Sequence, residues 1–189
     1  MPKSGIAPSI LNSELNMSPP AKTWHDAVMD VFHAQKIRQV AYVPDTGLKR
    51  LIELVLADKE MQAIPLTTEE EGVALAVGAC LGGERVALLV QSSGAGNCIN
   101  MLGMLIECRV PLLMLVTMRG TWAEFNPWQI PMAEATAPVL KAIGCVVKSV
   151  DDTEQVGAVI SAACQMAYNT NRVVAVQMDQ RLVGVKEFK

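Results

Sequence analysis

The chain has 189 residues, of which 51% are hydrophobic and 4% aromatic, so a single domain with a sizeable aliphatic core is expected. The formal net charge of −3 supplies no basic surface for nucleic acid or anionic lipid. No continuous apolar run reaches the roughly 18 residues of a membrane span. The polar, proline-broken start lacks the apolar segment of a signal peptide.

The cysteines and histidines exclude two further classes of protein. Five cysteines at scattered spacings, without a CxxC pair, indicate neither a disulfide framework nor a zinc site. They predict buried free thiols in a reducing cytoplasm. His25 and His33, eight residues apart, do not suggest a metal centre, and no metal ligand is assigned.

Helical and strand patterns alternate along the chain after a flexible N-terminal arm predicted over residues 1–20, and residues 21–189 are predicted to form the domain. In chain order the pattern predicts helix 21–35, strand 39–44, helix 47–58, strand 62–66, helix 69–83, strand 85–91, helix 95–108, strand 111–118, helix 131–144, strand 145–150, helix 152–169 and strand 172–178.

The strands are continuous apolar runs, which is typical of parallel strands covered on both faces. The fold class predicted is therefore α/β: a doubly wound, mainly parallel six-stranded sheet with helices on both faces. Ligands of such sheets bind at the carboxyl ends of the strands. The loops VPDTGL, TTEEE, QSSGAGN and TMRGTWAEFNPWQ lie there and are the segments to examine.

The TTEEE loop places three carboxylates ahead of an uncharged helix. Thr68 as N-cap with Glu71 three residues later would form a capping box, and acids suit the positive end of a helix dipole. This interpretation accounts for Glu71 and leaves Glu69 and Glu70 open. A carboxylate where an apolar helix meets the sheet is also placed for acid–base chemistry. Spacing does not choose among the three acids.

Two other loops are less specific. The segment SSGAGN resembles a phosphate cradle but lacks the Walker lysine and the full dinucleotide fingerprint, and its glycines could equally form a tight turn. Neither Ser92 nor Ser93 fits the GxSxG pattern of a serine hydrolase. The loop 119–129 contains Arg119 and two tryptophans, and it could face either a substrate or a protein partner.

Taken together, VPDTGLKRLIE, EEEGVALAVGACL, LLVQSSGAGNCINML and PLLMLVTMRG resemble the pyrimidine-binding half of thiamine diphosphate-dependent 2-oxoacid decarboxylases. The likeness covers about residues 21–180. It is greatest to members that act on pyruvates with an anionic tail, and it implies a carboxy-lyase that converts 3-sulfopyruvate to sulfoacetaldehyde and CO₂. Phosphonopyruvate decarboxylation is the alternative within the family.

The resemblance also implies roles for individual residues. The family's glutamate stands nine residues before a helix glycine, and counting back from Gly78 reaches Glu69. Glu69 would hydrogen-bond N1′ of the cofactor's aminopyrimidine, leaving Glu70 and Glu71 to capping. The turn with Ser92, Ser93, Gly94, Gly96 and Asn97 would pack around that ring. Asp45 would lie near the reacting carbon, and Arg119 would bind the anionic tail or form a structural salt bridge.

The family's second half, which holds the diphosphate and Mg²⁺ with a GDG…N signature, has no counterpart among the 189 residues. The resemblance therefore implies a separate β subunit that carries that domain and most of the Mg²⁺ ligands. The apolar stretches VALAVGACL and CINMLGML would be either its contact surface or simply core. The other classes that stay open are a non-catalytic module on the same scaffold and a nucleotide-binding domain.

Overall fold

The computed structural model describes residues 22–185. The predicted flexible arm lies outside the described residues, as do residue 21 and residues 186–189 of the predicted domain. Within residues 22–185 no helix is both long and apolar enough to cross a bilayer.

Six strands and eight helices follow one another in nearly the predicted order. The strands are β1 (Ile37–Tyr42), β2 (Gln62–Pro65), β3 (Arg85–Gln91), β4 (Leu112–Thr117), β5 (Val146–Val150) and β6 (Val173–Met178). The helices are α1 (Trp24–Ala34), α2 (Lys49–Ala57), α3 (Glu69–Leu81), α4 (Ser92–Asn97), α5 (Ile99–Cys108), α6 (Gln129–Ala142), α7 (Val156–Thr170) and α8 (Gln180–Val183). Short 3₁₀ turns at η1 (Thr46–Leu48) and η2 (Thr153–Gln155) precede α2 and α7.

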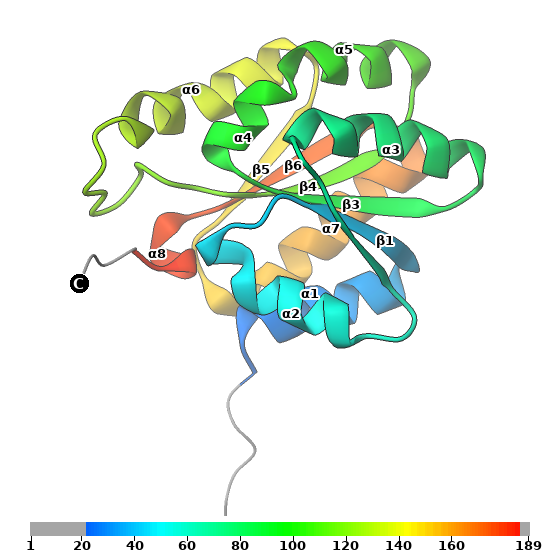
Figure 1. Cartoon of the computed structure of the whole chain (residues 1–189), viewed down its shortest axis with the longest axis horizontal. Coiled ribbons are helices and arrows are strands. Elements are labelled where there is room, and N and C mark those ends of the chain that lie inside the picture. The colour runs from blue at the N-terminus through cyan, green and yellow to red at the C-terminus, as the bar shows by residue number, and fades with distance from the viewer. Residues whose placement is uncertain (1–21, 186–189) are drawn as a thin grey trace, which may run out of the picture.

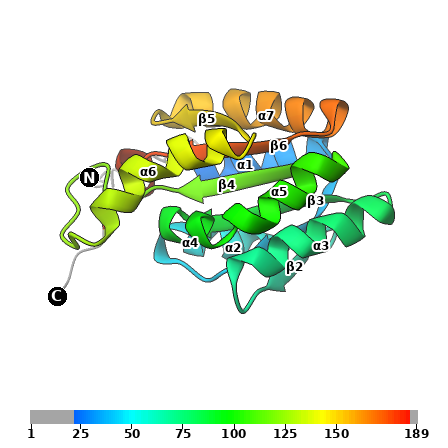
Figure 2. The ribbon, with the colours of Figure 1, turned by 90° about the horizontal axis from the view of Figure 1, so that it is seen from above.

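The strands form one sheet in the order β2-β1-β3-β4-β6-β5, and every pair is parallel. The helices α1, α2 and α7 cover one face, while α3, α4, α5 and α6 cover the other (Figures 1 and 2). After β1 the chain turns to one side for β2 and then returns to the other side of β1 for β3. Such a reversal leaves a crevice at the carboxyl ends of the strands. The predicted fold class is confirmed, with a sheet that is wholly parallel.

The continuous apolar strands arise because each strand supplies two cores. In β3, Ala87 and Leu89 pack with α1, α2 and α7, whereas Leu88 and Val90 pack with α3, α5 and α6. Successive strand side chains point to opposite faces, so a strand covered on both faces needs apolar residues at every position. This packing holds the strand ends, and the loops that leave them, in fixed positions.

Three local features differ from the sequence-based prediction or extend it. The helix predicted over 95–108 begins three residues earlier, at Ser92, and is interrupted at Cys98. The last strand is followed by α8, for which no prediction was made. The helix predicted over 131–144 is confirmed despite Pro138, because Pro138 and Glu134, whose carbonyl would have accepted the missing hydrogen bond, both lie on the exposed side of α6.

Candidate functional site

The carboxylate of Glu69 is held between two helices. Glu69 is the first residue of α3 and is half-buried. Asn97, at the end of α4, donates a hydrogen bond from Nδ2 to Glu69 Oε2 at 2.9 Å. Gly94 lies so close that a Cβ there would be 2.2 Å from Glu69 Oε1. Only glycine therefore allows α4 to approach this carboxylate, which fixes its position.

A second glycine sets the depth at which α3 begins. A Cβ at Gly72 would lie 2.4 Å from Leu88 Cδ1 and 2.9 Å from Leu66 Cδ1. The absence of a side chain lets the first turn of α3 pack directly on β3. That approach brings Glu69 toward α4, so the position of the acid depends on packing in the core beneath it.

The three consecutive acids have different environments. Glu71 accepts a hydrogen bond at Oε2 from the backbone N–H of Thr67, at 2.7 Å, and thereby caps the chain entering α3. The predicted capping box is wrong, because Glu71 accepts from Thr67 and not from the N-cap residue Thr68, and the Thr68 side chain makes no capping hydrogen bond. The capping role predicted for Glu70 is also wrong. Its Oε2 is buried with no hydrogen-bond partner among the described residues.

The segment SSGAGN forms helix α4 and is not the glycine-rich turn that was expected. Neither Gly94 nor Gly96 has a positive φ, so neither is needed for a left-handed backbone. Their contacts differ, since a Cβ at Gly96 would meet only Met132 Sδ, at 3.4 Å. The glycine of this segment that packing requires is Gly94. Its role is to make room for Glu69.

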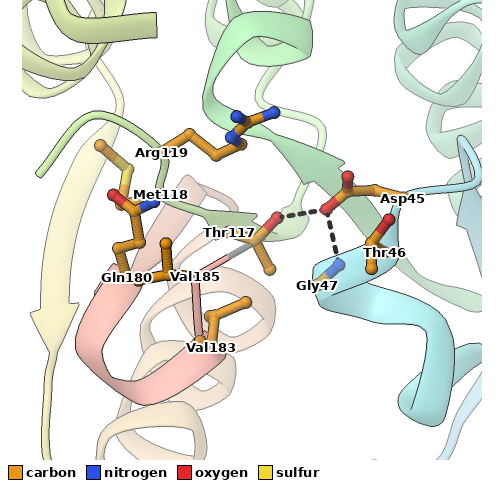
Figure 3. A pocket seen from close by; sticks show the side chains of 10 residues that line it. Asp45, Thr46, Gly47, Thr117, Met118, Arg119, Gln180, Val183 and Val185 are labelled. Atoms are coloured by element: carbon orange, nitrogen blue, oxygen red, sulfur yellow. Dashed lines mark hydrogen bonds between the residues drawn. The ribbon is translucent and has the colours of Figure 1, made fainter. Parts of the chain in front are cut away.

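A second polar group surrounds Asp45, which follows β1. Gln91 Nε2, at the end of β3, donates to Asp45 Oδ1 at 2.8 Å. The Gly47 N–H donates to Oδ2 at 3.1 Å, and Thr117 Oγ1 lies 3.4 Å from the same oxygen (Figure 3). Ser93 Oγ in turn donates to Gln91 Oε1 at 2.8 Å. Three strand ends thus hold one carboxylate, and Gln91 is a site residue that sequence reasoning missed.

Asp45 lines a hollow of about 350 Å³ at the carboxyl ends of β1, β4 and β6. We call it the Asp45 hollow; Figure 3 shows it from close by. It is lined by residues 45–47, 117–119, 180 and 183–185. Pockets of roughly 300–1,000 Å³ accommodate small-molecule ligands. The hollow therefore has the size and the polar groups for a small substrate.

Arg119 lines the Asp45 hollow but its guanidinium is already paired. Its Nε and Nη2 donate to the two carboxylate oxygens of Glu124, at 2.9 and 2.5 Å. The Arg119 side chain is 13% exposed and that of Glu124 only 2%. The Arg119 hydrogen bonds, followed by those of the Asn126 N–H and the Gln180 amide, lower the pKa of Glu124 to about 2. The salt-bridge alternative for Arg119 is therefore realised, within reach of the hollow.

The loop after β4 is anchored to α8 through Gln180, a residue that sequence reasoning missed. Gln180 is buried, accepts hydrogen bonds at Oε1 from the N–H groups of Thr121 and Trp122, and donates from Nε2 to Glu124. The anchored loop leaves its aromatic side chains outside, and Trp128 is 80% exposed. Position at the end of β6 was the only signal in the sequence for Gln180.

The predicted site residues form two neighbouring groups rather than one pocket. Asp45 and Arg119 line the Asp45 hollow, whereas Glu69, Gly94 and Asn97 lie together outside it. Helix α4 connects them, because Ser92 Oγ accepts from the Arg119 N–H and Ser93 bonds to Gln91. Within residues 22–185 no three His, Cys, Asp or Glu side chains are grouped to hold a metal ion.

Comparison with known proteins identifies the family. Residues 22–129 match the model of the thiamine pyrophosphate enzyme, N-terminal TPP binding domain. The chain belongs to this family. The matched part contains both polar groups, and thiamine pyrophosphate (thiamine diphosphate) is the cofactor that this domain binds.

Several similar proteins of this family are decarboxylases by name. The chain is 36% identical to sulfopyruvate decarboxylase subunit alpha of Methanococcus maripaludis, over 74% of this chain and 84% of that one. The same subunit of Methanocaldococcus jannaschii is 31% identical over 81% and 91%. Phosphonopyruvate decarboxylase of Streptomyces viridochromogenes is 32% identical over 68% of this chain and 33% of its own length.

Solved structures support the fold. A 2-oxoglutarate:ferredoxin oxidoreductase from Magnetococcus marinus superposes with a TM-score of 0.65 over 86% of this chain and 29% of the other. At 15% identity this likeness concerns the arrangement of strands and helices alone.

Proposed function

We propose that this chain is the α subunit of a thiamine diphosphate-dependent decarboxylase that converts 3-sulfopyruvate to sulfoacetaldehyde and CO₂. The observation that carries the proposal is the placement of Glu69, whose carboxylate is pinned by Gly94 and Asn97 inside the domain of a thiamine pyrophosphate enzyme. The similarity to relatives named sulfopyruvate decarboxylase subunit alpha supports the choice of substrate.

The surroundings of Glu69 fit the cofactor's aminopyrimidine ring. The half-buried carboxylate receives a hydrogen bond on one oxygen, Oε2, from Asn97. Its other oxygen, Oε1, faces Gly94, where the missing side chain leaves the backbone close to the acid. A carboxyl group so fixed can share a proton with a ring nitrogen. Glu69 then holds that proton at N1′, and the neighbouring part of α4 orients the ring.

When bound, thiamine diphosphate supplies the electron sink that decarboxylation of a 2-oxoacid requires. Asp45 lies at the substrate end of the site in this proposal. Gln91, Gly47 and Thr117 direct hydrogen bonds to its two oxygens, so its carboxylate has a defined orientation toward the Asp45 hollow. Arg119, at the rim of the same hollow, presents its positive charge to the anionic tail.

The proposal includes a β subunit that completes the site and supplies most of the ligands for Mg²⁺. Relatives named as α subunits support a divided enzyme. Helices α3 and α5 are the surface we assign to the contact: Leu81 is 85% exposed and Met104 is also exposed, whereas apolar side chains of this size are usually buried. The five free thiols are in keeping with a cytoplasmic complex.

Phosphonopyruvate decarboxylation is a second candidate, favoured by two relatives with that name. A sulfonate and a phosphonate have the same tetrahedral shape, so the dimensions of the hollow do not separate them. Their charges differ once the phosphonate has lost its second proton, which provides the basis of a distinction.

The test is CO₂ release from 3-sulfopyruvate by this chain co-purified with the subunit that carries the diphosphate-binding domain, with thiamine diphosphate and Mg²⁺. Glu69→Gln removes the acid while keeping its size, and we expect kcat to fall by roughly 10²-fold or more. Glu71→Gln is the matched control, because the amide oxygen can still accept the Thr67 hydrogen bond. Equal turnover by the two variants would contradict the proposal and favour a non-catalytic module.

A further inference from the structure

Glu124 is paired with Arg119, a cation that lines the Asp45 hollow. The two side chains form a two-pronged ion pair that is nearly excluded from water, and Glu124 is not itself among the lining residues. Arg119 also lies over the ring of Phe125, 5.5 Å from its centroid. These contacts fix the guanidinium with Nε and Nη2 turned to Glu124, so only its Nη1 side and the outer N–H of Nη2 are left for a ligand.

Glu124 stays ionised throughout the working pH range, because its partners hold its pKa at about 2. Its negative charge therefore accompanies Arg119 permanently. Removing the Glu124 carboxylate would leave the loop after β4 partly supported, since the Gln180 side chain still binds the N–H groups of Thr121 and Trp122.

The remaining charged groups around the hollow do not make it cationic. Asp45 lines both the hollow and an adjoining depression that also contains Lys49 and Glu53. Lys49 and Arg50 lie 4.0 and 3.6 Å from Glu53 and offset its charge. Among the described residues, three cations thus face three carboxylates when Glu124 is included. A ligand with one negative charge meets an adequate partner in Arg119, whereas a second negative charge gains no net attraction.

We propose that Glu124 makes the Asp45 hollow selective for a singly charged oxyanion tail over a doubly charged one. This inference rests on the proposed function, in which the hollow receives the substrate tail. A sulfonate carries one charge at every working pH. A phosphonate also loses a second proton and then carries two charges, but at a higher pH than the roughly 6 of a phosphate ester, because carbon withdraws fewer electrons than the ester oxygen. Glu124 is therefore the residue that separates the two candidate substrates, as a specificity determinant acting through Arg119.

The experiment measures binding of sulfoacetate and phosphonoacetate, which differ only in the tail, to the full chain in complex with its partner subunit by calorimetry. At pH 9.5, where the phosphonate tail is mostly doubly charged, we expect the wild-type complex to bind sulfoacetate tighter by roughly fivefold to tenfold. Glu124→Gln should reduce the ratio to about onefold to threefold, mainly by tightening phosphonoacetate binding. Glu134→Gln, which removes an exposed acid on α6, is the matched control and should keep the wild-type ratio.

Acidification tests the same idea without a substitution. At pH 5.5 the phosphonate of phosphonoacetate retains its second proton, so the wild-type ratio should approach that of the Glu124→Gln complex at pH 9.5. Taking the ratio of two affinities at each pH cancels titration of protein groups that affects both ligands equally. This measurement tests the charge selectivity of the hollow, and the substitution tests the contribution of Glu124 to it.

The outcomes separate the inference from the function. Equal affinities in the wild type at pH 9.5, a ratio unchanged by Glu124→Gln, or a ratio independent of pH each overturns the selectivity inference. Failure of the wild-type complex to release CO₂ from 3-sulfopyruvate, with the binding ratio intact, overturns the proposed reaction and leaves the selectivity of the hollow supported.

Discussion

Replacing Gly94 by alanine tests how closely the position of Glu69 is defined. The added Cβ would lie 2.2 Å from Oε1 and 2.6 Å from the carboxyl carbon of Glu69, far inside the separation of any real pair of such atoms. Relief requires a displacement of about 1 Å. A shift of that size would lengthen the 2.9 Å bond from Asn97 beyond hydrogen-bonding distance. The carboxyl group would then no longer be aimed at its proton partner.

Gly94→Ala is expected to lower turnover much more than it lowers stability. Overpacking of this kind costs about 1–3 kcal/mol of stability. A 1 Å misplacement of a catalytic group costs roughly 10²-fold in rate. We therefore expect a folded protein whose kcat for CO₂ release falls by about two orders of magnitude, with unfolding followed by urea titration of the same preparation.

The control for Gly94→Ala is Gly157→Ala, in the first turn of α7 on the opposite face of the sheet. A Cβ there would meet only Ala27 Cβ, at an ordinary 3.7 Å, so stability and turnover should be kept or slightly improved. Retention of wild-type kcat by a folded Gly94→Ala enzyme would refute the argument, because it would show that the contact with Glu69 is not needed for function.

Three further predictions concern neighbouring groups. Gln91→Leu removes a hydrogen bond to Asp45, so kcat for CO₂ release should fall by roughly tenfold, and an unchanged kcat would contradict this role of Gln91. Because the pKa of Glu124 is lowered in the folded protein, this carboxylate contributes stability that is fully present above the ordinary glutamate pKa and is lost as the pH falls toward about 2. The difference in unfolding free energy between wild type and Glu124→Gln, measured by urea titration, should therefore shrink over that pH range. Tyr168→Phe leaves the buried carbonyl of Val86 without its 2.7 Å donor and should cost about 1–3 kcal/mol in the same measurement, and an unchanged midpoint would contradict this assignment.

Interactions between residues that are close in the sequence account for the features of the fold and the site that could be predicted. The strands were recognisable because a strand with a helix layer on each face must be apolar at consecutive positions, as β3 and β4 are. The family was recognisable because four segments at the ends of successive strands follow one another in the family's order, and the spacing from Gly78 then selected Glu69. Asp45 and Arg119 were placed at strand ends for the same reason, since the strands could be counted.

Contacts between segments that are distant in the sequence account for the features of the site that could not be predicted. Gln91 and Gln180 are ordinary polar residues in the sequence, and they become site residues only because β1, β3, β4 and β6 end beside one another. The glycines of α4 suggested a turn, since glycine usually signals backbone freedom. Gly94 is instead helical, and its small size matters because Glu69, twenty-five positions away, occupies the space of its side chain.

The amino-acid sequence by itself determined the alternation of helices and parallel strands and the family, and through the family it led to the prediction of a role for Glu69. Only the tertiary structure decided which of three adjacent acids is pinned, which one caps a backbone N–H, and which cation is already paired with a buried carboxylate. The physical reason is that periodicity sets the direction of a side chain within its own element. The partners of that side chain depend on elements that the sheet brings beside it, and these partners determine how far its charge is compensated and how freely it can move.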